Sequence, residues 1–202
     1  EVVCHVHSEA IILRKSRNAS ASTPKMRRSL AIDVRATPLD RRKGILKAGG
    51  MTLRCALGKG GVSARKREGD GATPLAVVKP LALYFRRNCK VSGVWQSTLP
   101  KIPIRADEGW CDAPGDPRYN RPVKLPYHAS HEKMMRDDRL YNVCIVLDWN
   151  MYPRLWSRGS AIFMHIARPG LKPTEGCIAL EPRDMRRLLP FLNCRTRIRI
   201  LR

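Results

Sequence analysis

Acidic residues are scarce in this sequence. Its 202 residues include 17 Asp and Glu against 39 Lys and Arg, which gives a formal net charge of +22. A chain this basic is expected to meet anionic partners, and nucleic acid and the anionic polymers of a cell envelope are the two candidates. Residues 1–50 hold 11 basic and 4 acidic residues. The excess is therefore spread along the chain, which excludes a basic tail on a neutral protein.

Signatures of nucleic-acid and metal binding are also missing. The sequence has no helix-turn-helix pattern, no zinc-finger spacing and no aromatic RNA-binding motif. Seven cysteines occur without a single CxxC pair, which excludes a zinc ribbon. Their odd number leaves at least one free thiol, and we expect neither a disulfide framework nor a metal site. A basic nucleic-acid-binding protein without catalysis stays open as one interpretation of the charge.

Long apolar runs are absent as well. No stretch approaches the roughly 20 residues of a membrane span, and residues 10–13 are too short for the apolar segment of a signal peptide. We therefore expect neither feature within these residues. Residues 1–27 include a small, polar, turn-prone run at 18–25 and are predicted to form a disordered leader. One folded domain is predicted at residues 28–202.

The patterns that are present favour a mainly β fold. Apolar and polar residues alternate at 30–35 and 195–200, which predicts half-buried strands. The run at 142–148, continuous and rich in Val and Ile, predicts a buried strand, and strand-like runs also occur at 53–57 and 160–166. Short helices are predicted at 131–136, after a capping Ser130, and at 181–189, where Pro182 takes a favourable first-turn position. We expect a mixed β-sandwich or flattened barrel with one or two short helices.

The segment at residues 101–126 is rich in Pro, Gly and Asp and is too long for a simple turn. Long ordered loops of this kind often cover functional sites. We expect this segment to cover one end of the domain as a lid.

His165 and Cys177 are the residues with the clearest potential for chemistry. His165 ends a predicted buried strand, and eleven residues separate it from Cys177. A thiol reacts as its thiolate, and a neighbouring imidazole can lower its pKa. Gly176 permits a tight turn whose backbone N–H groups can face a developing oxyanion. Spacing alone is weak support, because an unrelated histidine and a buried core cysteine are the commoner explanation of such a pair.

The surrounding residues resemble a known family. Thr174, Gly176, Cys177, Ile178 and Leu180 match the catalytic motif of the L,D-transpeptidases, also called YkuD-type domains, and residues 68–75 resemble that family's Thr-Pro turn. Stretches at 109–112, 119–123, 136–141 and 159–165 are similar to a proteobacterial branch. The resemblance covers residues 30–202.

The resemblance implies a cysteine acyltransferase that acts on peptidoglycan stem peptides. Cys177 would be the nucleophile, His165 its base and Gly176 the turn residue of the oxyanion hole. D-Ala would leave, and an amine of another stem or of another envelope component would take the acyl group. No cofactor or metal is implied, and carbapenem β-lactams would acylate the cysteine. A monomer in the periplasm or cell envelope, with a role in wall biogenesis and cell shape, is expected.

Three positions depart from the family pattern. Glu175 stands where a second histidine is usual, Ala179 where an arginine is usual, and Ala76 where a glycine is usual. Arg168 or Lys172, in the loop after His165, is expected to supply the missing positive charge.

Thr174, Arg168, Trp110 and Tyr119 are the candidate substrate-binding residues. Burial as core or loop anchors is an equal alternative for the two aromatic residues. An L,D-carboxypeptidase, which passes the acyl group to water, stays open, because the motif does not determine the acceptor.

Overall fold

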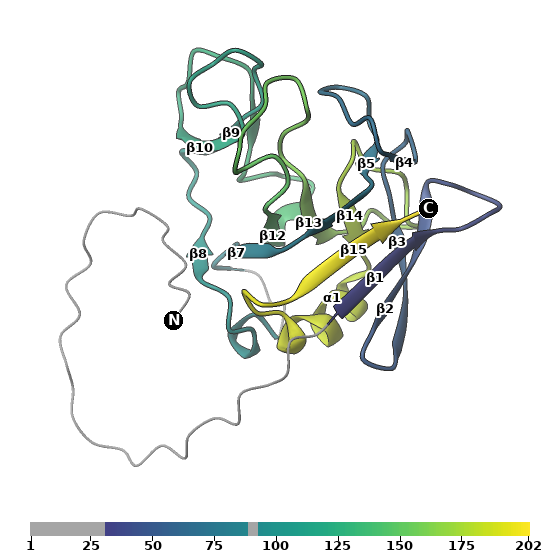
Figure 1. Cartoon of the computed structure of the whole chain (residues 1–202). Coiled ribbons are helices and arrows are strands. Elements are labelled where there is room, and N and C mark those ends of the chain that lie inside the picture. Colours follow the sequence, from purple (N-terminus) through teal and green to yellow (C-terminus); the bar gives the residue numbers. More distant parts are fainter. Residues whose placement is uncertain (1–30, 89–92) are drawn as a thin grey trace, which may run out of the picture.

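The computed structural model describes residues 31–88 and 93–202 (Figure 1). The leader predicted at residues 1–27 lies outside the described residues, as do Cys4 and Cys89. The first strand begins at Ala31, one residue after the position at which the alternation of apolar residues starts.

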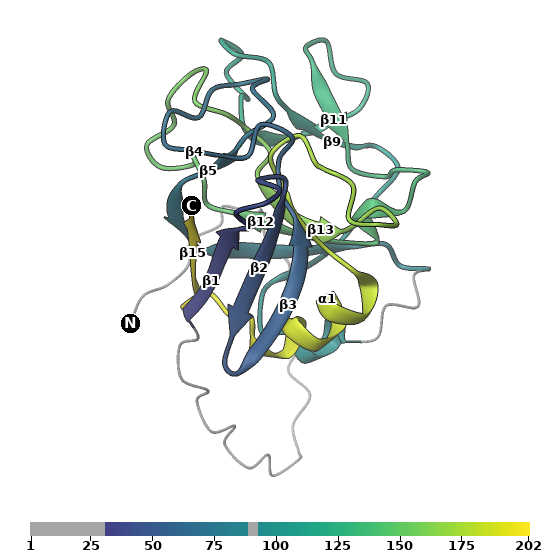
Figure 2. The same cartoon turned by 90° about the vertical axis from the view of Figure 1, so that its right-hand side faces the viewer.

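One large mixed sheet forms most of the domain. Its ten strands follow the spatial order β6 (Ala76–Val78), β15 (Arg197–Leu201), β1 (Ala31–Ala36), β2 (Lys43–Ala48), β3 (Met51–Ala56), β14 (Ile178–Leu180), β13 (Phe163–Ile166), β12 (Val143–Leu147), β7 (Pro80–Phe85) and β8 (Lys101–Pro103). Strands β1 and β15 pair in parallel, so the two ends of the described chain lie side by side. Figure 2 shows β15, β1, β2 and β3 as neighbours on one side of the domain.

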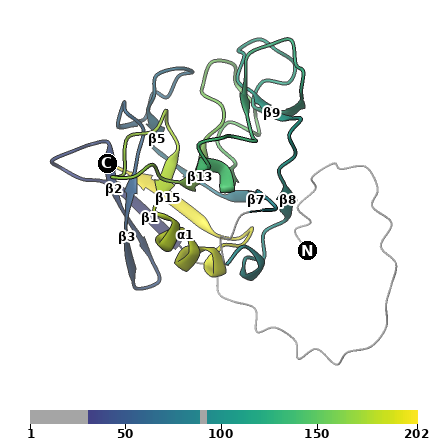
Figure 3. The same ribbon diagram turned by 180° about the vertical axis from the view of Figure 1, so that it is seen from behind.

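The core lies on the inner side of this sheet. Ile32, Val34, Ile198 and Ile200 are fully buried, as the alternating pattern predicts. They join the cluster that contains Leu188 of α1 (Pro182–Leu188), the single α-helix among the described residues. Seen from behind, α1 lies between the β1–β3 part of the sheet and β7 (Figure 3). The sheet curls around this helix, and the prediction of a mainly β fold with short helices is confirmed.

Two smaller sheets complete the fold. The first has the order β10 (Arg121–Lys124), β9 (Glu108–Cys111) and β11 (His131–Lys133), and the second pairs β4 (Val62–Ser63) with β5 (Thr73–Pro74). Three short 3-10 helices occur at Val94–Gln96, Leu140–Asn142 and Leu189–Phe191.

The three-stranded sheet corrects two expectations. The helix predicted at 131–136 is wrong, because residues His131–Lys133 pair antiparallel with β9. The segment at 101–126 is not a long loop, because it contributes β8 to the main sheet and forms β9 and β10. Asp112, directly after β9, lines the pocket described below. The segment therefore contributes to the wall of this pocket through its sheet and is not a loop that covers it.

The described residues include five free cysteines, and they lack a metal-ligand cluster and a membrane-spanning helix. Five cysteines of the described ranges are free: Cys55, Cys111, Cys144 and Cys177 are buried and Cys194 is exposed. Among residues 31–88 and 93–202, no three His, Cys, Asp or Glu side chains gather as they would around a metal ion. None of the helices in these ranges has the length and apolar character needed to cross a membrane.

Candidate active site

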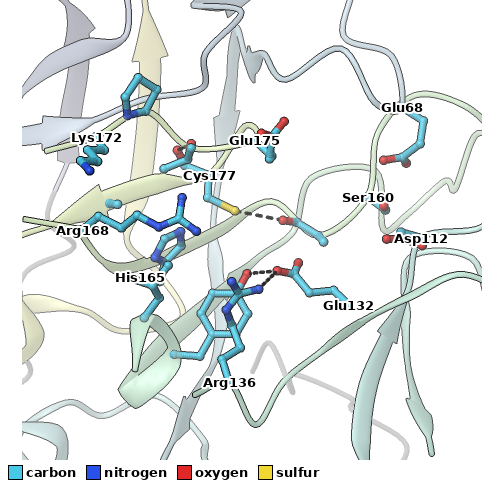
Figure 4. Close-up of a pocket in the computed structure, with 16 residues that line it drawn as sticks. Glu68, Asp112, Glu132, Arg136, Ser160, His165, Arg168, Lys172, Glu175 and Cys177 are labelled. Carbon is cyan, nitrogen blue, oxygen red and sulfur yellow. Dashed lines mark hydrogen bonds and ion pairs between the residues drawn. The ribbon is translucent and has the colours of Figure 1, made fainter. Parts of the chain in front are cut away.

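Parallel pairing of β13 with β14 brings His165 and Cys177 to one pocket. His165 pairs in register with Ala179, and Cys177 directly precedes β14. Both side chains are almost fully buried, with exposed fractions of 5% and 8%. Figure 4 shows the imidazole and the thiol in the same pocket, and both line it. Two residues twelve positions apart in sequence therefore line one pocket, because the intervening loop joins adjacent parallel strands.

The thiol of Cys177 is held by backbone groups of the segment before β13. Its Sγ accepts a hydrogen bond from the N–H of Phe163 at 3.3 Å and donates one to the carbonyl of Ala161 at 3.2 Å. No hydrogen bond joins it to His165 within the described chain. The sulfur is thus anchored as a neutral S–H group in the resting site.

The imidazole of His165 is held in one tautomer. Its Nδ1 lies 2.8 Å from the carbonyl oxygen of Ile166, which can only accept, so Nδ1 carries the proton. No described residue hydrogen-bonds Nε2, the other ring nitrogen, which keeps its lone pair. The ring also packs edge-on against Tyr141, with 5.2 Å between ring centroids. This arrangement leaves a nitrogen that can accept a proton inside the pocket.

Burial keeps both groups neutral. It raises the pKa of the Cys177 thiol to about 12, and the negative charge of Glu132 adds to the effect. It lowers the pKa of His165 to about 4, against the opposing hydrogen bond to Ile166. In this resting site, burial is the largest influence on the thiol pKa and raises it. The site holds a neutral pair at pH 7, and charge separation must accompany the reaction.

The turn before Cys177 depends on Gly176 and Thr174. Gly176 has φ +133°, and a Cβ there would lie 2.8 Å from the carbonyl oxygen of Ala72, so only glycine fits. Its N–H donates to Thr174 Oγ1 at 3.2 Å, and that hydroxyl donates to the carbonyl of Cys177 at 2.6 Å. The Gly176 N–H is therefore already occupied, and Gly176 shapes the turn without offering a free oxyanion donor.

The Thr-Pro turn supports the cysteine turn through a shared segment. Thr73 Oγ1 accepts from the N–H of Gly58 at 2.8 Å. On the other side of that segment, Thr174 N–H donates to the carbonyl of Leu57 at 3.0 Å, and Lys59 N–H donates to the carbonyl of Thr174 at 2.8 Å. The two motifs lie about one hundred residues apart in the sequence, and both are hydrogen-bonded to the segment at residues 57–59.

The pocket has walls of opposite charge. In Figure 4, Glu68, Asp112 and Glu132 lie on one side of the Cys177 sulfur, and His165, Arg168 and Lys172 lie on the other. Its volume of about 190 Å³ is smaller than that of most ligand pockets, so it suits one amino-acid-sized part of a longer ligand.

The acidic wall is partly neutralised by the protein itself. Glu132 Oε1 accepts from Tyr141 at 2.7 Å and from Arg136 at 3.0 Å, and burial raises the pKa of this carboxyl. In contrast, Asp112 Oδ1 and Ser160 Oγ are buried and have no hydrogen-bond partner among the described residues. Buried polar atoms without a partner are uncommon in folded proteins, and these two, on lining residues of one pocket, indicate that it takes a polar ligand.

Four residues were candidates for substrate contact, and the structure separates them. Arg168 and Thr174 line the pocket, as does Lys172. Trp110 and Tyr119 do not, and their exposed fractions are 2% and 0%. These two aromatic side chains therefore occupy the core positions that were the alternative expectation for them.

The two aromatic residues instead support the pocket from behind. Trp110 packs edge-on against Phe163 with 5.1 Å between ring centroids. The Tyr119 hydroxyl donates to Glu68 at 2.5 Å and holds that carboxylate in the pocket wall. Sequence reasoning missed the wall residues Asp112, Glu132, Tyr141 and Ser160, since nothing in their local patterns distinguishes a pocket carboxylate from a surface one.

Both the sequence and the fold of this chain are similar to those of known proteins. The family model of the L,D-transpeptidase catalytic domain (YkuD) matches residues 37–200. An L,D-transpeptidase from Mycobacterium smegmatis superposes with a TM-score of 0.39 at 12% identity, over 85% of this chain and 58% of that chain. L,D-transpeptidase 1 of Mycobacterium tuberculosis gives 0.37 and 12%, over 86% and 62%. This chain thus spans about three fifths of each. The search of curated proteins found no match.

Proposed function

The chain belongs to the L,D-transpeptidase catalytic domain family, and from that premise we propose that it is a cysteine acyltransferase that acts on peptidoglycan stem peptides. The family supports a transpeptidase-type function in the cell wall. One observation carries the assignment of residues: the buried Cys177 thiol and the unbonded Nε2 of His165 share a pocket that has room for part of a peptide.

The proposed first half-reaction forms a thioester. His165 Nε2 takes the thiol proton while Cys177 Sγ attacks the carbonyl carbon of the diamino acid at position three of the stem. The bond to D-Ala then breaks, and the imidazolium returns its proton to the leaving amine. In the second half-reaction an acceptor amine attacks the thioester, transfers a proton through His165 and restores the free thiol.

The neutral resting pair is compatible with this chemistry. A buried thiolate with no bound electrophile would be costly, because burial disfavours the charged form. A bound carbonyl provides a new site for the negative charge, so deprotonation of sulfur and attack on carbon proceed together. The hydrogen bond that the sulfur accepts from the Phe163 N–H holds it for this step, whereas the one that its S–H donates to the Ala161 carbonyl is given up when His165 takes the proton.

The basic side of the pocket is proposed to bind the carboxylate of D-Ala. Arg168 is 3.7 Å from Asp138, and Lys172 has no ion-pair partner among the described residues. These two cations take the place of the family's arginine, which is Ala179 here. We expect Arg168→Ala and Lys172→Ala to raise KM for the donor peptide. Unchanged kinetics in both variants would remove this assignment.

Product analysis tests the function. Purified chain is incubated with a disaccharide tetrapeptide and the products are measured by mass spectrometry. Loss of D-Ala with formation of cross-linked dimers, absent in Cys177→Ala, supports the proposal. Loss of D-Ala without dimers identifies an L,D-carboxypeptidase using the same thioester. An unchanged tetrapeptide, together with salt-dependent DNA binding, would favour the nucleic-acid interpretation.

Location and branch complete the proposal. The family is associated with the cell envelope, and we propose a periplasmic or envelope location, a role in cell shape and a monomeric state. We also propose a proteobacterial origin, from the stretches at 109–112 and 119–123.

A further inference from the structure

The excess positive charge is unevenly placed on the fold. Residues 105–139, which form most of the three-stranded sheet and the acidic wall, hold seven basic and seven acidic residues. Residues 31–56 and 197–202, which form β1, β2, β3 and β15, hold nine basic and two acidic residues. The stretch that carries the three-stranded sheet is thus neutral overall, and part of the excess positive charge lies on one part of the main sheet.

The register places six cations on one side of that sheet. Paired residues share a face, and the pairs Asp33 with Arg199, Asp33 with Lys47, and Ile45 with Arg54 connect the four strands. We call this surface the basic sheet face; its cations are Arg35, Lys43, Lys47, Arg54, Arg197 and Arg199. The opposite side of the same strands carries the buried core residues, so this face is the outer one.

Four of these six cations form no ion pair within the described chain. Arg199 forms a two-point ion pair with Asp33, and Lys43 lies 4.0 Å from Asp40. The other four have no ion pair with any residue of the described ranges. Like charges on neighbouring strands lower stability, so this arrangement is not explained by folding. An anionic surface outside the molecule would supply the missing negative charge.

The turn between β1 and β2 adds an apolar anchor at the edge of the face. Leu39 has an exposed fraction of 101%. The turn is rigid: Thr37 Oγ1 donates to the carbonyl of Asp40 at 2.8 Å, and the Asp40 carboxylate accepts from the Arg42 N–H at 3.0 Å. A fully exposed leucine followed closely by two basic residues, here Arg41 and Arg42, can insert at a lipid headgroup boundary. Val77, paired with Arg199 at the other edge, is 56% exposed.

We propose that the basic sheet face docks on an anionic lipid bilayer, with Leu39 inserted between headgroups. A sheet spaces its side chains about 4.8 Å apart across strands and about 6.8 Å along them, and this two-dimensional array suits a plane of charges. Single-stranded nucleic acid is bound by stacking on aromatic rings, and the face carries none. None of the six cations lines the pocket, so docking through them uses none of the pocket residues.

Vesicle binding tests this proposal independently of catalysis. The chain is sedimented with vesicles of phosphatidylglycerol and phosphatidylcholine at low and at physiological salt. Arg35→Gln combined with Arg54→Gln is expected to lower the partition constant about 25-fold, at about fivefold per removed cation. The matched control, Arg118→Gln with Lys133→Gln, removes two exposed charges from the three-stranded-sheet side and is expected to change it less than about twofold. Leu39→Ser is expected to lower the binding that persists at high salt.

Several outcomes would overturn the proposal. One is a wild type that does not bind the vesicles at low salt. Another is an equal loss of affinity in both double variants, which would show that binding depends on net charge and not on the basic sheet face. Duplex DNA that binds in the same salt range, with the same sensitivity to Arg35 and Arg54, would assign the face to nucleic acid. Thermal unfolding checks that each variant is folded, and Lys47→Gln with Arg197→Gln replaces the first pair if that pair misfolds.

Discussion

Thr174 is expected to act by holding the turn that carries Cys177. Its hydroxyl makes two hydrogen bonds inside that turn, at 2.6 Å to the Cys177 carbonyl and at 3.2 Å from the Gly176 N–H. Thr174→Val preserves the shape of the side chain and removes both. At about 1 kcal/mol net for each hydrogen bond, the free energy of unfolding should fall by about 2 kcal/mol. For a domain of this size that corresponds to a melting temperature lower by roughly 4 to 8 °C.

The same substitution should slow acylation of the thiol. A turn without these bonds no longer fixes the direction of Sγ, and small misplacements of a reacting group cost large factors in rate. We expect the second-order rate of Cys177 acylation by a carbapenem to fall at least about tenfold. The assay is time-resolved intact-mass spectrometry, at a temperature where both proteins are folded.

Thr174→Ser is the matched control, because it keeps the hydroxyl and loses only a methyl group. It should retain most of the wild-type stability and acylation rate. If Thr174→Val matched the wild type in both measurements, or if Thr174→Ser were as impaired as Thr174→Val, the hydrogen bonds would not be the reason for the threonine. The residue would then act through packing or through direct contact with substrate.

Three further predictions concern the thiol, its base and the turn. Burial raises the pKa of Cys177 to about 12, so the rate of its alkylation by iodoacetamide should rise about tenfold per pH unit from pH 7 to 10. A rate that levels off near pH 7 would show that the cysteine is already a thiolate and would contradict this prediction. Burial lowers the pKa of His165 to about 4, so the free energy of unfolding should fall by up to about 3 kcal/mol as the pH drops from 6.5 to 4. His165→Asn should remove this pH dependence, which urea unfolding at several pH values measures. Gly176→Ala should lower the free energy of unfolding by about 1 to 3 kcal/mol, because the residue has φ +133° and the new Cβ would lie 2.8 Å from a carbonyl oxygen. An unchanged melting temperature in thermal unfolding would refute the steric argument.

The elements that the sequence predicts well are those with a local pattern. The alternation of Ile32 with Val34 and of Ile198 with Ile200 predicts two strands, and both lie in the sheet with these residues buried. Pro182 predicts the start of the helix, which begins at that residue. In each case the residues that decide the structure lie within a few positions of one another.

Features that depend on distant pairing were missed. Residues His131–Lys133 form a strand because they pair with β9, which lies about twenty residues earlier in the sequence. The local pattern, with Ser130 as a possible helix cap, does not predict this pairing. Trp110 and Tyr119 are aromatic residues typical of a binding surface, yet both are buried, and Trp110 packs against Tyr84 and Phe163 of the main sheet. The carboxylates of Asp112 and Glu132 reach the pocket only through that sheet, so the charge of its wall could not be predicted from local patterns.

The proximity of His165 and Cys177 is an intermediate case. Their spacing alone does not predict a contact, and the resemblance to a family motif suggested it. The structure brings both side chains to one pocket through the parallel pairing of β13 and β14. Their catalytic roles stay a proposal, since neutral groups without a mutual hydrogen bond become a catalytic pair only when an electrophile is bound.

Covalent capture of Cys177 tests the central claim most directly. The chain is exposed to a carbapenem, its intact mass is measured, and the modified peptide is sequenced by mass spectrometry. A thioester on Cys177 is predicted, with the mass of one carbapenem added to the wild type and none added to Cys177→Ala. An unmodified wild type under conditions in which the chain is folded, or an adduct that persists in Cys177→Ala, would contradict the assignment of Cys177 as the nucleophile.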